Sequence, residues 1–320
     1  MPGSSTSLFS DLDVEVTPDA QIGNMTWYGV GGRADLLLRP HHTRALRELV
    51  KRCYRSSTPL RVLGGGANLL VADESIDGIV VRLDQPELRS ITYNPSGEAR
   101  ILRAAAGADL ARTLMDTTRR GLGGLGQMAG IPGTIGGAIR MNAGGVYGSI
   151  GDSVRSVTCI TRRGDLVTYP ASELHFEYRR TNIPDPLIVS ATFDLLPTDP
   201  IALRRRVKEI FAFKKSTQPL ADSSAGCAFK NPIDPITEER VSAGRLIEEA
   251  GLKGLAVGGA SISHHHANFI VAKPLARAED VLQVLELVRR RVYEHCGVEL
   301  EREVVVWRRG EEDESPEERL

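Results

Sequence analysis

The spacing of apolar residues predicts several helices along the chain. In residues 43–54, Leu46, Leu49 and Val50 share one helical face, and Thr43 can cap the first turn. In residues 278–296 an apolar stripe of the same period ends before Gly297, which is a typical helix stop. Two shorter helices are expected after capping residues: 110–120 after Asp109 and 243–250 after Ser242. A basic helix is expected between them, at 201–215.

Short apolar and β-branched runs predict strands between these helices. Residues 154–160 and 165–169 are expected to form a hairpin that turns at Arg163 and Gly164, and residues 1–40 look irregular apart from extended pieces at 26–32 and 34–40. The other expected strands are 60–63, 69–72, 76–83, 99–107, 187–196, one within 263–272, and 298–307.

This mixture of elements predicts an α+β protein, and 320 residues suffice for two domains. The sequence PTDP at 197–200 marks the expected boundary between a larger domain, 1–200, and a smaller α/β domain, 201–309. Residues 310–320 are highly charged and are expected to be a disordered tail.

Composition narrows the class of protein. A net charge of -1 with 41% hydrophobic and 25% charged residues fits a globular protein and argues against nucleic acid or an anionic membrane as partner. The four cysteines stand singly, which argues against a zinc site and a disulfide framework. The N-terminal residues resemble no secretory leader, and no window is apolar enough to span a membrane. We therefore expect a cytoplasmic protein.

Glycine is concentrated in one segment, Gly121–Gly148, which holds 11 of the 32 glycines. Such a backbone can approach a ligand closely, and successive N–H groups bind phosphate, although a flexible glycine-rich loop would have the same composition. Gly64–Gly66 follows a predicted strand and is open to two interpretations, a phosphate loop or a tight turn between core strands. The G-x-G-x-x-G pattern at 121–126 follows a helix, not a strand, which argues against a Rossmann site.

Seven stretches, in this order, resemble the UDP-N-acetylenolpyruvoylglucosamine reductase (MurB) family. Together they span about residues 24–308, and AGIPGTIGGA followed by MNAG is the most specific of the matches. The matching stretches are YGVGGRADLLLRP, LGGGANLLVAD, GQMAGIPGTIGGAIRMNAG, EYRRT, AGCAFKNP, AGRLIEEAGLKG and ELEREVVVW.

The resemblance implies a vanillyl-alcohol-oxidase (PCMH)-type FAD-binding domain followed by a substrate-binding domain. It implies an enzyme that uses FAD and NADPH to reduce the enolpyruvyl ether of UDP-N-acetylglucosamine to UDP-N-acetylmuramate. Only Arg180–Pro186 separates Arg179 from the next predicted strand, so the chain looks like the short-loop, type II form, which lacks the loop with a substrate-binding tyrosine.

Three residues match the family's catalytic positions. Arg179 in EYRRT would stabilise negative charge, although its residue type alone would suit the surface equally well. Cys227 occupies the position that is usually the proton-donating serine; a lone cysteine is more often a small buried residue. Glu303 would polarise the enol or supply its proton, whereas the strand period alone places it with Glu299 and Glu301 on a solvated face.

The resemblance also assigns residues to ligands. Tyr178, Lys215, Lys230 and Asn231 would contact the substrate, with Lys214 as an alternative to Lys215. Asn142 would bind substrate or flavin, or else form a turn. The FAD would lie on Gly64, Gly65, Gly66, Ala67, Asn68, Leu69, Gly130, Ile131, Pro132, Gly133, Gly136 and Gly137.

Other interpretations remain open at this stage. His264, His265 and His266 invite a metal, but adjacent residues on a strand point to opposite faces and no further ligand has suitable spacing. The chain could also be an FAD oxidase or dehydrogenase of the same superfamily with another substrate, or a catalytically silent flavin- or nucleotide-binding protein. We expect a monomer or weak dimer whose partners are the UDP-sugar and NADPH.

Overall fold

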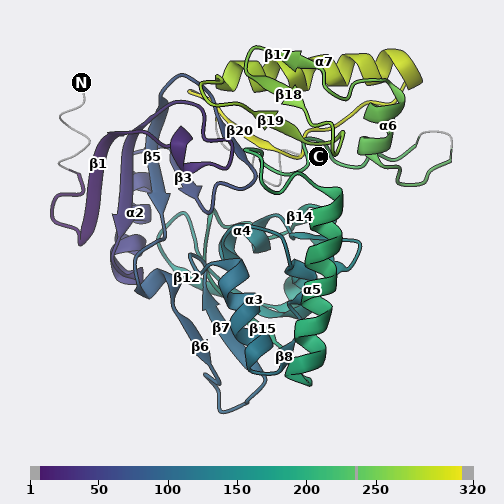
Figure 1. Ribbon diagram of the computed structural model, residues 1–320. Coiled ribbons are helices and arrows are strands. Elements are labelled where there is room, and N and C mark those ends of the chain that lie inside the picture. Colours follow the sequence, from purple (N-terminus) through teal and green to yellow (C-terminus); the bar gives the residue numbers. More distant parts are fainter. Residues whose placement is uncertain (1–7, 235–236, 312–320) are drawn as a thin grey trace.

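The computed structural model describes residues 8–234 and 237–311, so most of the predicted tail lies outside the described residues. Two sheets form the larger part of the molecule (Figure 1). The first has the order β1-β2-β5-β3, in which β1 is antiparallel to β2 and the other pairs are parallel. Its strands are β1 (Val14–Ala20), β2 (Ala34–Pro40), β3 (Leu60–Leu63) and β5 (Ile76–Arg82).

The second sheet is antiparallel throughout, in the order β12-β11-β15-β7-β6. The predicted hairpin is its β11–β12 pair, and Gly164 turns it with a φ of 85° that suits glycine. The strands are β6 (Ile91–Tyr93), β7 (Ile101–Ala105), β11 (Val154–Ile160), β12 (Leu166–Pro170) and β15 (Leu187–Asp194).

Helices pack on these sheets, and their predicted apolar faces are the buried ones. The helix α2 (Thr43–Arg55) buries Leu46 and Leu49, but its N-cap is His42, whose ring accepts a hydrogen bond from the Ala45 N–H, and not Thr43. The helix α3 (Leu110–Arg119) is capped by Asp109, as predicted. The short helix α4 (Ile135–Arg140) packs on β15 and β7. The turns η1 (Gly23–Met25), η2 (Glu87–Arg89), η3 (Gly126–Met128), η4 (Ile150–Ser153) and η5 (Ala171–Glu173) connect these elements.

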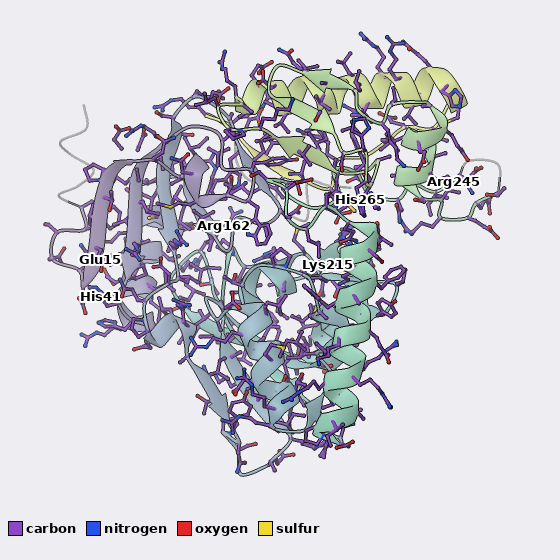
Figure 2. All side chains as sticks on the ribbon, viewed as in Figure 1. Glu15, His41, Arg162, Lys215, Arg245 and His265 are labelled. Atoms are coloured by element: carbon purple, nitrogen blue, oxygen red, sulfur yellow. The ribbon has the colours of Figure 1, made fainter. Side chains whose placement is uncertain are left out.

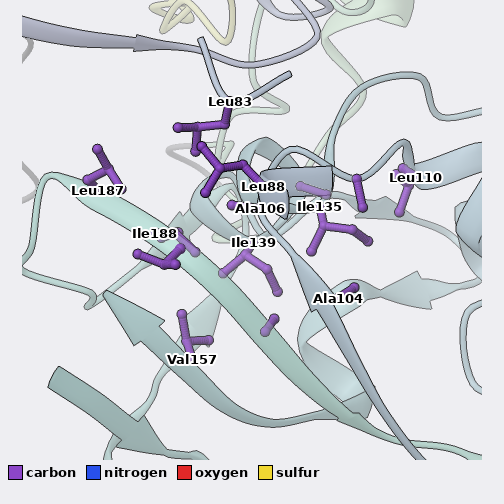
Figure 3. Packing of buried hydrophobic residues seen from close by; sticks show 14 of the residues in the cluster. Leu83, Leu88, Ala104, Ala106, Leu110, Ile135, Ile139, Val157, Leu187 and Ile188 are labelled. Carbon is purple, nitrogen blue, oxygen red and sulfur yellow. The ribbon is translucent and has the colours of Figure 1, made fainter. Parts of the chain in front are cut away.

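The main hydrophobic core runs from the first sheet and α2 to the second sheet and its helices, and Figure 3 shows part of it. Ile135 and Ile139 of α4 are fully buried in this cluster with Val157 and Leu187. Each such side chain contributes about 1.5–3 kcal/mol by leaving water. The core therefore fixes α4, and with it the glycine-rich segment that leads into the helix.

The helix α5 (Pro200–Thr217) packs against α3 and η3, and buries Val207 and Ile210 in this same core. By packing, it thus belongs with the larger unit, although it follows the predicted boundary at residue 200. In Figure 1 it runs from the lower unit up to the smaller one. The predicted Ile201–Lys215 helix is present and is capped by Asp199.

The smaller unit is a three-stranded sheet, β17-β18-β19, covered by α6 and α7 (Figure 1). Ser242 caps α6, and Gly297 ends α7 at a φ of 71°, as predicted. The bounds are α6 (Ala243–Glu249), α7 (Ala278–Cys296), β17 (Ala256–Val257), β18 (Ala260–Ile262) and β19 (Ile270–Ala272).

The last strand of the chain joins the smaller unit to the larger one. The strand β20 (Val305–Trp307) returns to the larger unit and pairs in parallel with β4 (Leu69–Val71), where Trp307 is buried among residues of the first sheet. The remaining pairs are β8 (Leu122–Gly123) with β16 (Leu196–Pro197), β9 (Gly144–Gly145) with β10 (Gly148–Ser149), and β13 (Phe176–Glu177) with β14 (Arg180–Thr181). Among the described residues, no helix is long and apolar enough to cross a membrane.

Candidate active site

A cavity of about 2080 Å³ lies between the glycine-rich loops of the larger unit and the smaller unit. Small-molecule pockets usually measure roughly 300–1,000 Å³. The volume therefore suits a large cofactor together with a substrate. All twelve residues predicted to contact FAD line it, as do Arg179, Cys227 and Glu303.

The cavity wall is built from two loops that touch through their backbones. A Cβ added to Gly65 would lie 2.6 Å from the Cα of Gly133, closer than atoms can approach. Gly66 has a φ of 65° and faces the Met25 carbonyl oxygen, which would lie 2.6 Å from an added Cβ. We call the hollow formed by the loops at 64–69 and 130–137 the glycine cradle. Side chains at its glycines would fill it, so the chain holds glycine where a ligand must reach the backbone. This geometry fits a dinucleotide with a pyrophosphate.

Arg179 lies in the two-residue turn between β13 and β14, with a φ of 58°. A bulky residue rarely adopts this conformation, so surrounding contacts must hold it there. Its Nη1 donates to the Gly144 carbonyl oxygen at 3.1 Å, and its Nε lies 2.5 Å from Glu303 Oε1. The guanidinium is thereby aimed into the cavity from the glycine-rich side.

Glu303 is buried beside Arg179, with only 10% of its side chain exposed. Its backbone carbonyl accepts a hydrogen bond from Asn68 Nδ2 at 3.0 Å, which ties it to the glycine loop. Burial raises the pKa of Glu303, and the positive charge of Arg179 offsets part of that rise. The carboxyl group can therefore exchange a proton nearer to neutral pH than an ordinary glutamate can.

The interpretation from the strand period, which placed Glu303 with Glu299 and Glu301 on a solvated face, is wrong. Glu299 and Glu301 are exposed, at 79% and 68% of their side chains, while Glu303 is buried. The regular strand begins only at Val305, so period-2 alternation does not apply to the preceding residues.

Cys227 also lines the cavity and follows Gly226, which has a φ of 77°. Its backbone bridges to Phe269, and the next residue, Ala228, accepts a hydrogen bond from the Glu303 N–H at 2.9 Å. Burial, with a further contribution from Glu303, raises the pKa of the Cys227 thiol to about 12. The thiol is consequently protonated at neutral pH.

Comparisons with known proteins bear on this site. Residues 34–169 match the family model of an FAD binding domain, and residues 218–307 match that of the UDP-N-acetylenolpyruvoylglucosamine reductase C-terminal domain. A curated protein named UDP-N-acetylenolpyruvoylglucosamine reductase from Desulfosudis oleivorans is 39% identical over 309 residues, covering 94% of this chain and 96% of that protein. The chain belongs to the UDP-N-acetylenolpyruvoylglucosamine reductase family.

Two further comparisons agree with the family assignment. The protein of that name from Syntrophus aciditrophicus is 39% identical over 287 residues, covering 89% of this chain and 90% of that one. The crystal structure of UDP-N-acetylenolpyruvylglucosamine reductase (MurB) from Thermus caldophilus has a TM-score of 0.73 and 36% identity, covering 92% of this chain and 99% of that one. The α+β fold with an FAD-binding domain, predicted from the resemblance, is thus confirmed, and FAD is the cofactor.

The structure places Lys214, and not Lys215, at the cavity of this family member. The Lys214 side chain is buried beside Gly130 and lines the cavity, with Nζ 3.5 Å from the Gln127 carbonyl oxygen. Burial, with the nearby charge of Arg179, lowers the pKa of Lys214 to about 8. Lys215 is exposed at the end of α5 (Figure 2), because the next residue of a helix points about 100° away.

The prediction that Asn142 contacts a ligand is also corrected. Its Nδ2 donates to the Glu177 carbonyl oxygen at 2.8 Å and its Oδ1 accepts from the Gly151 N–H at 3.2 Å. With a φ of 38° and a buried side chain, Asn142 is the turn-forming residue of the two alternatives. It positions the hairpin that carries Arg179.

The other predicted substrate residues form the rim of the site. The Tyr178 ring lies between the guanidinium groups of Arg179 and Arg240, 5.1 and 4.2 Å from its centroid. Asn231 lines the cavity and donates its backbone N–H to the Tyr178 hydroxyl at 3.2 Å. Lys230 forms an ion pair with Glu301. Tyr178 and Lys230 thus lie next to the cavity lining, and Asn231 lies in it.

The three consecutive histidines separate in space. His265, which is labelled in Figure 2, has its Nε2 3.0 Å from the Ser216 carbonyl oxygen, whereas His266 packs on Phe269 and lines the cavity. Within the part of the chain that the structure describes, no three His, Cys, Asp or Glu side chains are grouped as metal ligands.

Tyr147 is a cavity residue that the sequence did not suggest. It lies between β9 and β10, and its ring meets Phe213 of α5 edge-on at 5.9 Å. In the sequence, Tyr147 is a single aromatic residue within a run of glycines, and this pattern does not show whether the ring faces a ligand or the core. Together with Lys214 it forms the part of the wall contributed by α5 and its neighbours.

Proposed function

We propose that this protein reduces the enolpyruvyl ether of UDP-N-acetylglucosamine to UDP-N-acetylmuramate with NADPH, a step in peptidoglycan precursor synthesis. The observation that carries the proposal is the convergence of Arg179, Glu303 and Cys227 on one cavity whose other wall is the glycine cradle. FAD, which the glycine loops at 64–69 and 130–137 would hold, would supply the hydride-transfer chemistry between NADPH and the substrate's vinyl carbon.

Arg179 stabilises the negative charge that hydride addition creates next to the substrate carboxylate. Its guanidinium is held in place by Gly144 and Glu303 before the charge develops, so little reorganisation is needed. A planar guanidinium that stays charged at all working pH values suits a carboxylate or enolate oxygen.

Glu303 and Cys227 handle the proton that completes the reaction. Glu303 polarises the enol or delivers a proton through water, which its raised pKa favours. The Cys227 thiol gives its proton to the substrate carbon, forming the C–H bond while the S–H bond breaks, and the thiolate recovers a proton from solvent. Because the thiol is protonated at neutral pH, this donor is available before each turnover.

We further infer a cytoplasmic enzyme that acts as a monomer or weak dimer, with NADPH and the UDP-sugar as its partners. A net charge of -1 gives it no general attraction for nucleic acid or anionic lipid. The short-loop form follows from β15, which begins at Leu187, so that only seven residues separate it from Arg179.

An anaerobic titration tests the proposed reaction. NADPH is expected to bleach the flavin absorbance of the purified protein, and the enolpyruvyl substrate is then expected to restore it. Flavin that stays reduced after this addition would indicate an oxidase or dehydrogenase with another substrate. Protein without flavin absorbance, even after incubation with FAD, would indicate neither enzyme.

The role of Cys227 predicts opposite outcomes for two small substitutions. Cys227→Ala removes the proton donor and should slow flavin reoxidation by substrate roughly 10²-fold, while reduction by NADPH proceeds normally. Cys227→Ser keeps a hydroxyl donor and should remain active. Stopped-flow absorbance separates the two half-reactions. Normal turnover of the alanine variant would show that another group donates the proton.

Neighbouring lysines offer a matched test of phosphate binding. Lys214→Gln should raise the KM for the UDP-sugar about tenfold, the effect of losing one charged hydrogen bond, whereas Lys215→Gln should not. The Lys214 ammonium is charged below its pKa of about 8, so the wild-type KM should rise as pH increases through that value. A KM that rises equally in wild type and Lys214→Gln would contradict this assignment.

A further inference from the structure

The side chain of Thr181 carries a buried hydroxyl group without a hydrogen-bond partner among the described residues. Its side chain is 3% exposed, and its Oγ1 has no hydrogen-bond partner among the residues that the structure describes. Leaving a hydroxyl buried without a partner costs about 1–3 kcal/mol. Native proteins rarely retain such a group unless something else pairs with it.

Thr181 lines the same cavity as the glycine cradle and lies two residues after Arg179. It ends β14 and pairs with Phe176 of β13. The strand β14 packs on α4, the helix that begins within the cradle at Ile135. The hydroxyl group therefore belongs to the cavity that the glycine cradle lines, next to the helix that begins within that cradle.

The segment that follows Thr181 is held by several hydrogen bonds. Arg140 of α4 donates to the Ile183 carbonyl oxygen at 2.9 Å and also to that of Asp185. The Asn182 side chain accepts from the His175 N–H at 2.8 Å and donates to the Glu173 carbonyl oxygen at 2.9 Å. These bonds fix the backbone that follows Thr181, and the 3% exposure of Thr181 keeps its hydroxyl group away from solvent.

We infer that the Thr181 hydroxyl hydrogen-bonds the bound FAD. The inference rests on the flavin chemistry of the proposed function, and it adds a side-chain contact to a site otherwise dominated by backbone. FAD offers carbonyl, phosphate and ribityl oxygens as acceptors, and a threonine hydroxyl can donate to any of them. The contact satisfies the buried group only when the cofactor is present.

Thr181→Val tests this contact because it replaces the hydroxyl by a methyl group of the same shape. FAD binding by the apoprotein should weaken roughly tenfold, the effect of one hydrogen bond, and Thr181→Ser should bind nearly as well as wild type. The flavin-free Val variant should unfold at the same temperature as wild type or higher, because an unpaired polar group has been removed. The measurements are FAD titration by fluorescence and thermal unfolding with and without FAD.

Thr117 provides a matched control. It is fully buried, and its hydroxyl donates to the Leu114 carbonyl oxygen at 2.9 Å. Thr117→Val should therefore lower the unfolding temperature and leave FAD affinity unchanged, the reverse of the Thr181 result.

Three outcomes would overturn the inference. FAD affinity of Thr181→Val equal to that of wild type would show that the hydroxyl serves another ligand. Equal loss of affinity in the Val and Ser variants would show that shape matters and the hydroxyl does not. Destabilised flavin-free Thr181→Val would show a partner within the protein. Failure of wild type itself to bind FAD would instead reject the proposed function.

Discussion

Replacing Glu303 with Gln is expected to slow flavin reoxidation by the enolpyruvyl substrate about 10³-fold, which is typical for loss of a group that handles protons in the transition state. The amide is nearly the same size, so the fold and the cradle should be preserved. Reduction of the flavin by NADPH should remain within a few-fold of wild type, because Glu303 acts on the substrate. Single-turnover absorbance measurements separate these two rates.

Glu299 provides the control for this experiment. It precedes Glu303 by four residues, is exposed, and pairs with Arg289 at 3.3 Å. Glu299→Gln should therefore turn over normally. If Glu303→Gln reoxidises as fast as Glu299→Gln, Glu303 has no part in proton transfer and its burial has a structural cause.

Arg179→Leu is expected to have the second large effect, on both activity and stability. Loss of a fixed cation at the developing charge should lower the rate of substrate reduction by about 10²–10³-fold. The substitution also leaves Glu303 buried without its partner, and breaking one side of a buried pair costs about 3–5 kcal/mol. Steady-state kinetics and thermal unfolding at pH 7 measure the two effects.

A double substitution shows whether the stability loss arises from Glu303. Arg179→Leu with Glu303→Gln removes both charges, so the double variant should unfold at a higher temperature than Arg179→Leu alone. The stability of the single variant should also recover as pH falls, because protonation of Glu303 removes the unpaired charge. Additive effects of the two substitutions would mean that these side chains are not coupled.

The local elements could be read from the sequence because their signals are local. Asp109, Ser242 and Gly297 mark helix ends by their own side-chain or backbone chemistry, and the structure agrees at all three. The strand β1 was missed, since only Val14 and Val16 alternate in it and Pro18 interrupts the pattern. This strand gains its place by pairing with β2 at the edge of the sheet, which a window of sequence does not contain.

The site itself depended on contacts that no local pattern encodes. Glu303 is buried because Asn68 and Arg179, far away in the sequence, hold it. Lys214 and Lys215 are adjacent and have the same sequence neighbours. The side of α5 that packs toward the cavity decides which of the two lines it. The resemblance supplied Glu303 where the strand period misled, and it could not resolve the choice between the lysines.

The parallel pairing of β20 with β4 also constrains when the enzyme can become active during its synthesis. The partners Val305 and Leu69 are joined by more than two hundred intervening residues, so closing this contact comes late on entropic grounds. A ribosome must translate 124 residues beyond Arg179 before Glu303 can meet it. The glycine cradle, made early, can therefore begin catalysis only after residue 303 has been translated, and a truncation that removes Glu303 removes part of the reaction centre.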